Sequence, residues 1–157
     1  MANQKLQVGR ALAVLPNDSV NIPFPDVITS GAVTAIAPYR LIDAAAAFIT
    51  NGVTIGSIVL NAINPNAGAT VSRVVSETEL ELSFDIFTNP GEAFSVYFGD
   101  NDNGCVLYVG TGGDVAVITV GGDNVVFKNL ASGQFVPVQV LRVKSTDTTA
   151  SDIIALW

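Results

Sequence analysis

A period of two runs from Glu77 to Ile86, with polar residues at the odd positions and apolar residues at the even positions from Leu80 on. Glutamate, aspartate and serine fill the odd positions, whereas Leu80, Leu82 and Phe84 lie among the even ones. Because successive side chains of a β-strand point to opposite faces, this period of two predicts a half-buried strand with one acidic face. After it, Asn89-Pro90-Gly91 predicts a turn, and Ala93–Phe98 reads as the return strand.

Further β-branched runs follow, and glycine-rich segments separate them. Because glycine adopts positive φ angles without steric cost, Gly110-Thr111-Gly112-Gly113 and Gly121-Gly122-Asp123-Asn124 predict hairpin connections. A proline inside one run, Pro137, predicts an edge strand or a bulge. The runs expected to form these strands are Cys105–Val109, Val115–Val120, Val125–Leu130, Phe135–Val143 and Ile153–Trp157.

Only one helix is predicted. Asp43 can cap the alanines that follow it up to Phe48, and Asn51-Gly52 can end the helix after two turns. About ten short strands make the fold class all-β. We expect an antiparallel β-sandwich or barrel host domain with an inserted small β-barrel-like module and minimal helix. Residues 1–34 and 100–157 are expected to form the split host domain, and residues 35–99 the inserted module.

Composition excludes several classes of function. The chain has 157 residues, no histidine and a single cysteine, which excludes a Ser-His-Asp triad, an intrachain disulfide and a zinc–thiolate cluster. Residues 74–124 carry nine carboxylates and no lysine or arginine, so a phosphate backbone would be repelled and we expect no nucleic acid partner. The same acidity also serves solubility.

No apolar run approaches the roughly 18 residues of a membrane span, so no membrane partner is expected. Ala11–Pro16 is too short for the core of a signal peptide. We therefore predict a chain that is made and folded in a cytoplasm.

Two polar segments have both a chemical and a structural interpretation. Glu77, Glu79 and Glu81 are closely spaced carboxylates of the kind that glycosidases use, but on one strand they read as a solvated face. Asp100-Asn101-Asp102-Asn103-Gly104 resembles the start of a calcium loop. Its glycine stands at the fifth position instead of the sixth, and Thr111 replaces the glutamate at the twelfth. A polar turn is the preferred interpretation, and ion binding by Asp100 and Asp102 stays open.

The remaining candidates also favour structural roles. Gly110–Asp114 lacks the lysine of a phosphate-binding loop. Cys105 has no cationic neighbour in sequence, so a buried thiol is expected instead of a nucleophile. Alternation places Phe94, Val96 and Phe98 on one face, which favours core packing over a sugar-stacking platform that would also include Tyr97 and Tyr108. We expect no catalytic residue, no cofactor and no metal site.

Both ends of the chain carry distinctive motifs. The first is "VGRALAVLPNDSVNIPFPDVITSG" (Val8–Gly31). The second lies in Gly104–Trp157, where Gly-Gly-Asp turns lead to "Phe-x-Pro-Val-x-Val-x-x-Val" and then to "Thr-Asp-Thr-Thr-Ala-x-x-Ile-x-Ala-Leu". In these motifs the chain resembles small virion structural proteins of tailed bacteriophages. Similar endings occur in head spike-base proteins of gene transfer agents and head-decoration proteins of cyanophages. The central "DAAAAFITNGVTIGSIVLN" through "TELELSFDIF" resembles a module inserted in several phage structural proteins.

The resemblance implies a non-enzymatic capsid decoration (cement) protein that binds the outer surface of the head and stabilises it. The implied partners are the major capsid protein, further copies of the chain in a homotrimer, and a head fibre. The alternative is a head spike base or a glycan-binding adhesion module of a tail or fibre. Either role places the protein in the virion.

Attachment is expected through the chain ends and one strand. The polar arm Met1–Arg10 spans about 33 Å when extended, enough to cross a subunit boundary, and the alternative is an arm that is simply disordered. The apolar end Ile153–Trp157 is expected to be buried against its own subunit or a neighbour. The residues predicted for the capsid or subunit interface are Lys5, Arg10, Phe135, Ile153 and Trp157.

Overall fold

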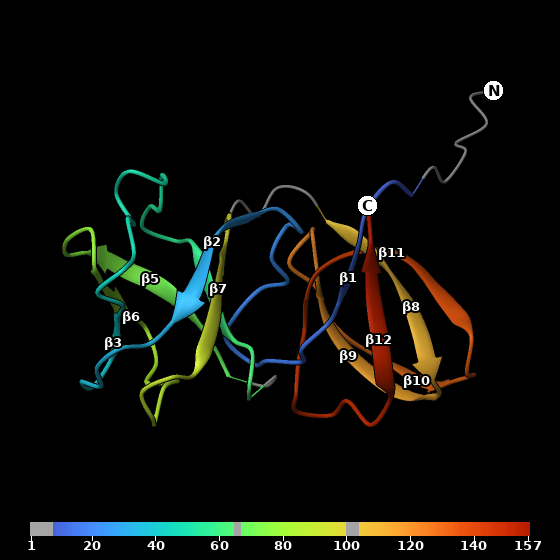
Figure 1. Ribbon diagram of the computed structural model, residues 1–157. Coiled ribbons are helices and arrows are strands. Elements are labelled where there is room, and N and C mark those ends of the chain that lie inside the picture. Colours follow the sequence, from blue (N-terminus) through green and yellow to red (C-terminus); the bar gives the residue numbers. More distant parts are fainter. Residues whose placement is uncertain (1–7, 65–66, 100–103) are drawn as a thin grey trace. The chain divides into compact units, whose positions relative to one another are not determined.

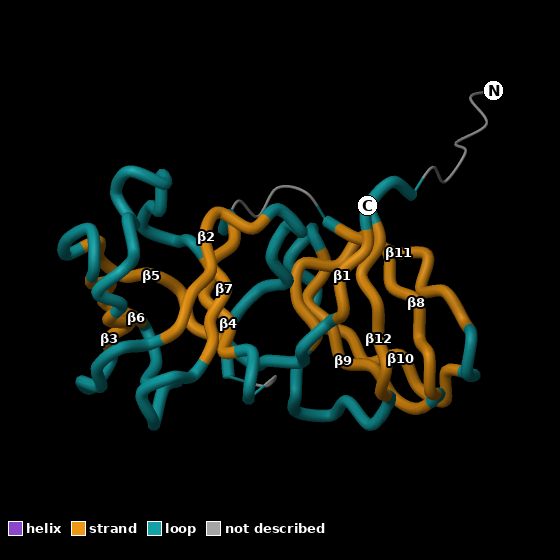
Figure 2. Tube along the Cα trace, in the orientation of Figure 1, coloured by secondary structure: helices purple, strands orange, loops and turns teal. Residues whose placement is uncertain are grey.

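The computed structural model describes residues 8–64, 67–99 and 104–157. Every regular element in these ranges is a β-strand, and none of the described residues is helical, so the all-β prediction is confirmed (Figure 2). The chain divides into two compact units. Unit 1 contains Met1–Asp18 and Asp102–Trp157, and unit 2 contains Ser19–Asn101.

Unit 1 is built on one six-stranded antiparallel sheet in the order β1-β12-β8-β11-β9-β10. Figure 1 shows the C-terminal strand β12 between β1 and β8. Buried valines, leucine and isoleucine from β8, β9, β11 and β12 fill the core on one side of this sheet. The strands are β1 (Ala11–Ala13), β8 (Cys105–Thr111), β9 (Gly113–Thr119), β10 (Asn124–Leu130), β11 (Gln134–Val143) and β12 (Ser151–Leu156).

One of the two predicted hairpins is confirmed. β9 and β10 pair directly, and Gly122 takes a φ of 88° in the turn between them. The hairpin predicted at Gly110–Gly113 is wrong, because β11 lies between β8 and β9. Gly112 instead marks a corner where a Cβ atom would lie 2.9 Å from the Ser132 nitrogen and closer still to the Leu130 carbonyl. Glycine is therefore required at this position for close approach of another backbone segment.

Pro137 lies in β11, which is an interior strand. The pairing of β11 with β8 shifts register between Val136 and Val140, around this proline. Of the two predictions for Pro137, the bulge is therefore confirmed and the edge position is wrong, since a register shift removes the need for its missing N–H.

Unit 2 is built on a second six-stranded antiparallel sheet in the order β2-β7-β4-β5-β6-β3. Residues 19–34, which the sequence predicts to lie in the host domain, instead belong to unit 2, where β2 pairs with β7. The strands are β2 (Val27–Ala32), β3 (Arg40–Ile42), β4 (Ile58–Asn61), β5 (Gly68–Val74), β6 (Glu79–Leu82) and β7 (Ala93–Tyr97).

A single bridge links the two ends of this strand order. Beyond β2, Ala35 forms an antiparallel bridge with Ile42 of β3. The Thr34 nitrogen donates to the Ile42 carbonyl at 2.8 Å, and the Thr34 hydroxyl accepts a hydrogen bond from the Ala44 nitrogen at 3.0 Å. The sheet therefore curls around one apolar core, to which Leu41, Phe48, Val59, Leu80, Phe94 and Val96 all contribute.

Only part of the alternating segment Glu77–Ile86 forms a strand. β6 covers Glu79–Leu82, and its apolar side chains Leu80 and Leu82 are buried as predicted, but Phe84 lies beyond the strand and is exposed. The expected return strand exists as β7, yet it pairs with β2 and β4 and not with β6.

The predicted helix Asp43–Phe48 is wrong, since the segment forms successive turns. Its amide groups find partners elsewhere: the Phe48 nitrogen donates to the Glu77 carbonyl at 2.9 Å, and the Ile49 and Thr50 nitrogens donate to the Glu77 carboxylate at 3.0 and 3.1 Å. Burial of Phe48 against the ring of Phe94, with centroids 6.0 Å apart, holds this arrangement. Tertiary contacts thus override the helix propensity of the alanines.

Removal of the Phe48 ring tests the assignment of this core. Phe48→Ala should lower the free energy of unfolding of unit 2 by about 3–5 kcal/mol, because the ring is fully buried and leaves a cavity. The control Ile49→Ala removes a side chain that is 56% exposed and should change it by less than about 0.5 kcal/mol. Equal effects of the two variants in chemical denaturation would contradict the assignment.

Candidate functional site

Four neighbouring strands of unit 1 present an uncharged row of side chains away from the core. Ala13 of β1 pairs with Ile154 of β12, Ile154 pairs with Tyr108 of β8, and Tyr108 pairs with Phe135 of β11. A second row runs beside it, because Leu156 pairs with both Ala11 and Val106. Cross-strand partners share one face of a sheet, so both rows lie on the same side.

The burial pattern shows that the two rows lie on the outer side of the unit 1 sheet, away from its core. The residues that alternate with the rows, among them Leu107, Val136, Ile153 and Ala155, are almost fully buried. The residues of the rows are exposed or half-buried. We call this surface the apolar face and define it as Ala11, Ala13, Val106, Tyr108, Phe135, Pro137, Ile154 and Leu156.

Two aromatic rings lie side by side at the β8–β11 end of the apolar face. Tyr108 and Phe135 lie edge to face, with centroids 5.4 Å apart, and Phe135 remains 50% exposed. No member of the face carries a charge. Contiguous apolar surface on the outer side of a sheet is typical of a site that docks against another surface.

The structure places the predicted interface residues in different environments. Phe135 belongs to the apolar face. Ile153 does not, because its side chain is 3% exposed and packs in the core of unit 1, so its assignment to an interface is wrong. Arg10 and Trp157 exchange backbone hydrogen bonds of 3.1 and 3.0 Å where β1 meets β12, and Trp157 is half-buried. Lys5 lies outside the described residues.

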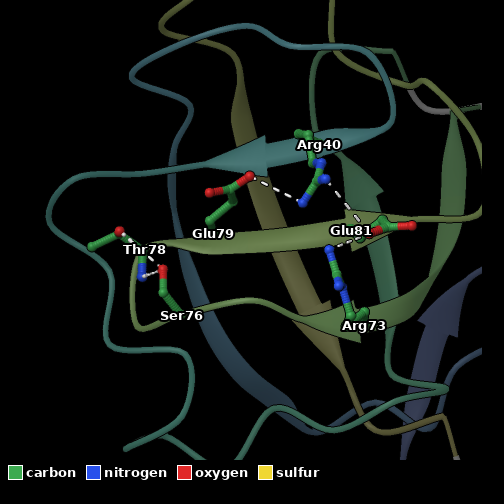
Figure 3. Close-up of polar contacts among 6 residues, drawn as sticks. All are labelled: Arg40, Arg73, Ser76, Thr78, Glu79 and Glu81. Carbon is green, nitrogen blue, oxygen red and sulfur yellow. Dashed lines mark hydrogen bonds and ion pairs between the residues drawn. The ribbon is translucent and has the colours of Figure 1, made fainter.

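The carboxylates of β6 form a charge ladder with two arginines (Figure 3). Glu81 lies directly opposite Arg40 on β3 and Arg73 on β5. Its Oε2 is 3.0 Å from Arg73 Nη2 and 3.6 Å from Arg40 Nη2, while Arg40 Nη1 is 3.0 Å from Glu79 Oε1. The acidic face is thus ion-paired and half-buried instead of simply solvated, and opposite charges on neighbouring strands favour this register.

The turn that precedes the ladder has its own hydrogen bonds. The Ser76 hydroxyl accepts the Thr78 amide at 3.2 Å, and the two hydroxyls lie 3.4 Å apart (Figure 3). Glu77, which lies between Ser76 and Thr78 in the sequence, binds the 48–50 segment instead. Hydrogen bonds from the Thr50 hydroxyl and backbone lower the pKa of the Glu77 carboxyl. The three glutamates therefore have separate structural partners.

The structural role of another carboxylate, Glu92, was not predicted from the sequence. It is almost fully buried and accepts hydrogen bonds from the Asn61 side chain at 2.8 Å, from the Thr88 hydroxyl at 2.8 Å, and from the Asn89 nitrogen at 3.1 Å. These donors, the Thr88 hydroxyl above all, lower the pKa of Glu92. These hydrogen bonds attach the loop between β6 and β7 to the end of β4.

The other predicted sites have different outcomes. Cys105 is a buried thiol as expected, and desolvation raises its pKa to about 12. Residues 100–103 of the calcium-like loop lie outside the described part of the chain. Phe94 packs in the core of unit 2, as predicted, whereas Phe98 is exposed, contrary to prediction. Among the residues that the structure describes, no cluster of three or more potential metal ligands occurs.

Neither a protein-family model, nor a curated protein, nor a solved structure matches the chain. Within the described ranges, no helix is long and apolar enough to cross a membrane.

The buried position of Cys105 predicts low thiol reactivity. In the native protein at pH 8, Ellman's reagent should react at a rate set by unfolding, because a thiol with a pKa of about 12 is almost entirely protonated at that pH. Denaturant should release one reactive thiol per chain. Immediate reaction of the native protein would show that Cys105 is accessible.

Acid should destabilise the protein. Hydrogen bonds lower the pKa values of Asp18, Glu77, Glu92 and Asp114 in the folded state, so the unfolded chain binds more protons below about pH 4. This contribution to stability is complete above the unfolded pKa values and is lost as the pH falls through the lowered, folded ones. Denaturation at pH 7, 5 and 3 measures it, and Glu92→Gln should show a smaller fall between pH 5 and 3. An unfolding free energy that stays constant down to pH 3 would contradict the assignment.

Proposed function

We propose that this protein is a non-enzymatic structural protein of a bacteriophage virion, which decorates the outer surface of the head as a cement protein. The apolar face of unit 1 carries the proposal, since it supplies a surface suited to docking on a preformed shell. The proposed partner at this face is the major capsid protein.

The residues that carry the resemblance to phage structural proteins also contribute to this face. Phe135 and Pro137 are the fixed positions of "Phe-x-Pro-Val", and Leu156 ends "Ile-x-Ala-Leu". The register places Leu156 in one row of the face and Phe135 in the other, on strands that are separated by β8. The motif positions thus gather on one surface although Pro137 and Leu156 lie 19 positions apart in the sequence.

Energetics also favour Phe135 and Tyr108 as anchors of the contact. Aromatic side chains dominate the binding energy of protein interfaces when a partner removes them from water. A net charge of −7 keeps the unattached protein soluble, while the uncharged face avoids the cost of burying a charge on attachment.

A second candidate is the adhesion module of a tail or fibre, and Tyr39 of unit 2 favours it. The Arg40 nitrogen donates to the Ala37 carbonyl at 3.2 Å, which closes a turn with Pro38 and Tyr39 at its centre. Tyr39 has a φ of 57°, at a turn position where glycine or asparagine is usual, and the residue is 54% exposed. An exposed aromatic ring held at some conformational cost suits sugar stacking. If Tyr39→Ala abolishes saccharide binding while head binding persists, unit 2 has this second role.

Charge placed on the apolar face tests the proposed function. Phe135→Asp should weaken binding to heads prepared without this protein by more than tenfold, because a carboxylate would be buried at the contact. Val120→Asp is the matched control: Val120 is an exposed apolar residue of unit 1 outside the face, and its replacement should leave binding unchanged. Circular dichroism establishes that both variants fold. Heads that bind Phe135→Asp as tightly as the native protein would refute attachment through this face.

A further inference from the structure

The strand β10 forms an open edge of the unit 1 sheet. It pairs with β9 on one side and stands last in the strand order. Every residue of β10 is exposed or half-buried, in contrast to the mostly buried centre of β9. Its length of seven residues is enough for another strand to pair with it.

The hydrogen bonds between β9 and β10 determine which backbone groups of β10 point outward. The Thr119 nitrogen donates to the Asp123 carbonyl at 3.0 Å, so the backbone of Asp123 faces β9. Hydrogen-bonding direction alternates along an antiparallel strand, and therefore Val125 and Phe127 also face β9. The N–H and C=O groups of Asn124 and Val126 consequently point outward, away from the sheet.

Residues 124–127 lack the features that normally prevent pairing at an edge. Their sequence is Asn-Val-Val-Phe, without charge or proline. The next residue, Lys128, directs its ammonium group back to Asp114 of its own unit at 2.9 Å. A register shift follows, with Asn129 at a φ of 54°, and it limits the open stretch on that side.

We propose that β10 pairs edge to edge with β10 of a second copy, antiparallel and around a two-fold axis at Val126. In this register Val126 lies opposite itself and Asn124 opposite Lys128, so that the outward N–H and C=O groups meet each other. An isologous contact of this kind uses the same strand twice and closes after two copies.

Register and burial select the second copy as the partner. Lys128 of each copy comes opposite the uncharged Asn124 of the other, so the pairing buries no charge against a like charge. Val125, which is 37% exposed in the single chain, comes to face Phe127 of the other copy. No like charges face each other in this register. The inference does not depend on the proposed function, and it replaces the three-fold association implied by the resemblance with a two-fold one.

Sedimentation equilibrium over a hundredfold range of concentration tests the pairing, with Val126→Pro as the variant. Proline removes the outward N–H and leaves the bonds to β9 intact, so the dissociation constant of the dimer should rise about tenfold or more. Ala11→Pro is the matched control. The mutual hydrogen bonds of Arg10 and Trp157 leave the Ala11 N–H pointing outward at the opposite edge, and the dimer should persist in this variant.

Hydrogen exchange of the native protein gives a second readout, which stands even if Val126→Pro does not fold. The Val126 amide should become protected as concentration rises through the dimerisation range, because it is paired only in the dimer. A monomer at all concentrations would overturn the inference. So would a trimer, or a dimer in which the Val126 amide stays unprotected.

Discussion

Strand geometry forces alternate side chains onto opposite faces of a sheet, and both units of this protein depend on that constraint. In unit 2 the sheet curls until Thr34 and Ala35, beyond its first strand, reach Ile42 of its last one, so the inward side chains share one core. In unit 1 the same alternation buries Leu107 and Val136 and turns their neighbours outward. Because those neighbours are also apolar, the outer side becomes a surface suited to a partner.

Much of the fold follows from local patterns, since alternation and glycine position act within a few residues. Leu80 and Leu82 were predicted to be buried, and the β9–β10 hairpin was predicted from its glycines. Which strands pair could not be predicted in the same way, because pairing is a long-range property. Gly112 shows the difference: a glycine required by close approach of the Leu130 carbonyl has the same sequence signature as a glycine in a hairpin. Asp43–Phe48 shows another limit, since Glu77 takes the amides that a helix would need.

The candidate site was predictable in part. Phe135 stands out in a strongly alternating run, but the apolar face exists only because β12 lies beside β8 and β8 beside β11, an order that no local pattern contains. Ile153 was assigned to an interface on apolar character alone, and one step of alternation along β12 places it in the core instead of Ile154. Nothing in the sequence indicated that Glu92 is buried and hydrogen-bonded, because asparagine, threonine and a carboxylate near a Pro-Gly turn have the composition of an ordinary loop.

We propose that this protein attaches to the head of a virus particle through the apolar face of unit 1. Cryo-electron microscopy of purified particles, with an antibody fragment against unit 2 as the label, tests this attachment. We expect label over the whole head surface, with density for Phe135 and Tyr108 against the major capsid protein. Label confined to the vertices would indicate a spike base, and label at the tail an adhesion module. Particles without label would contradict the claim.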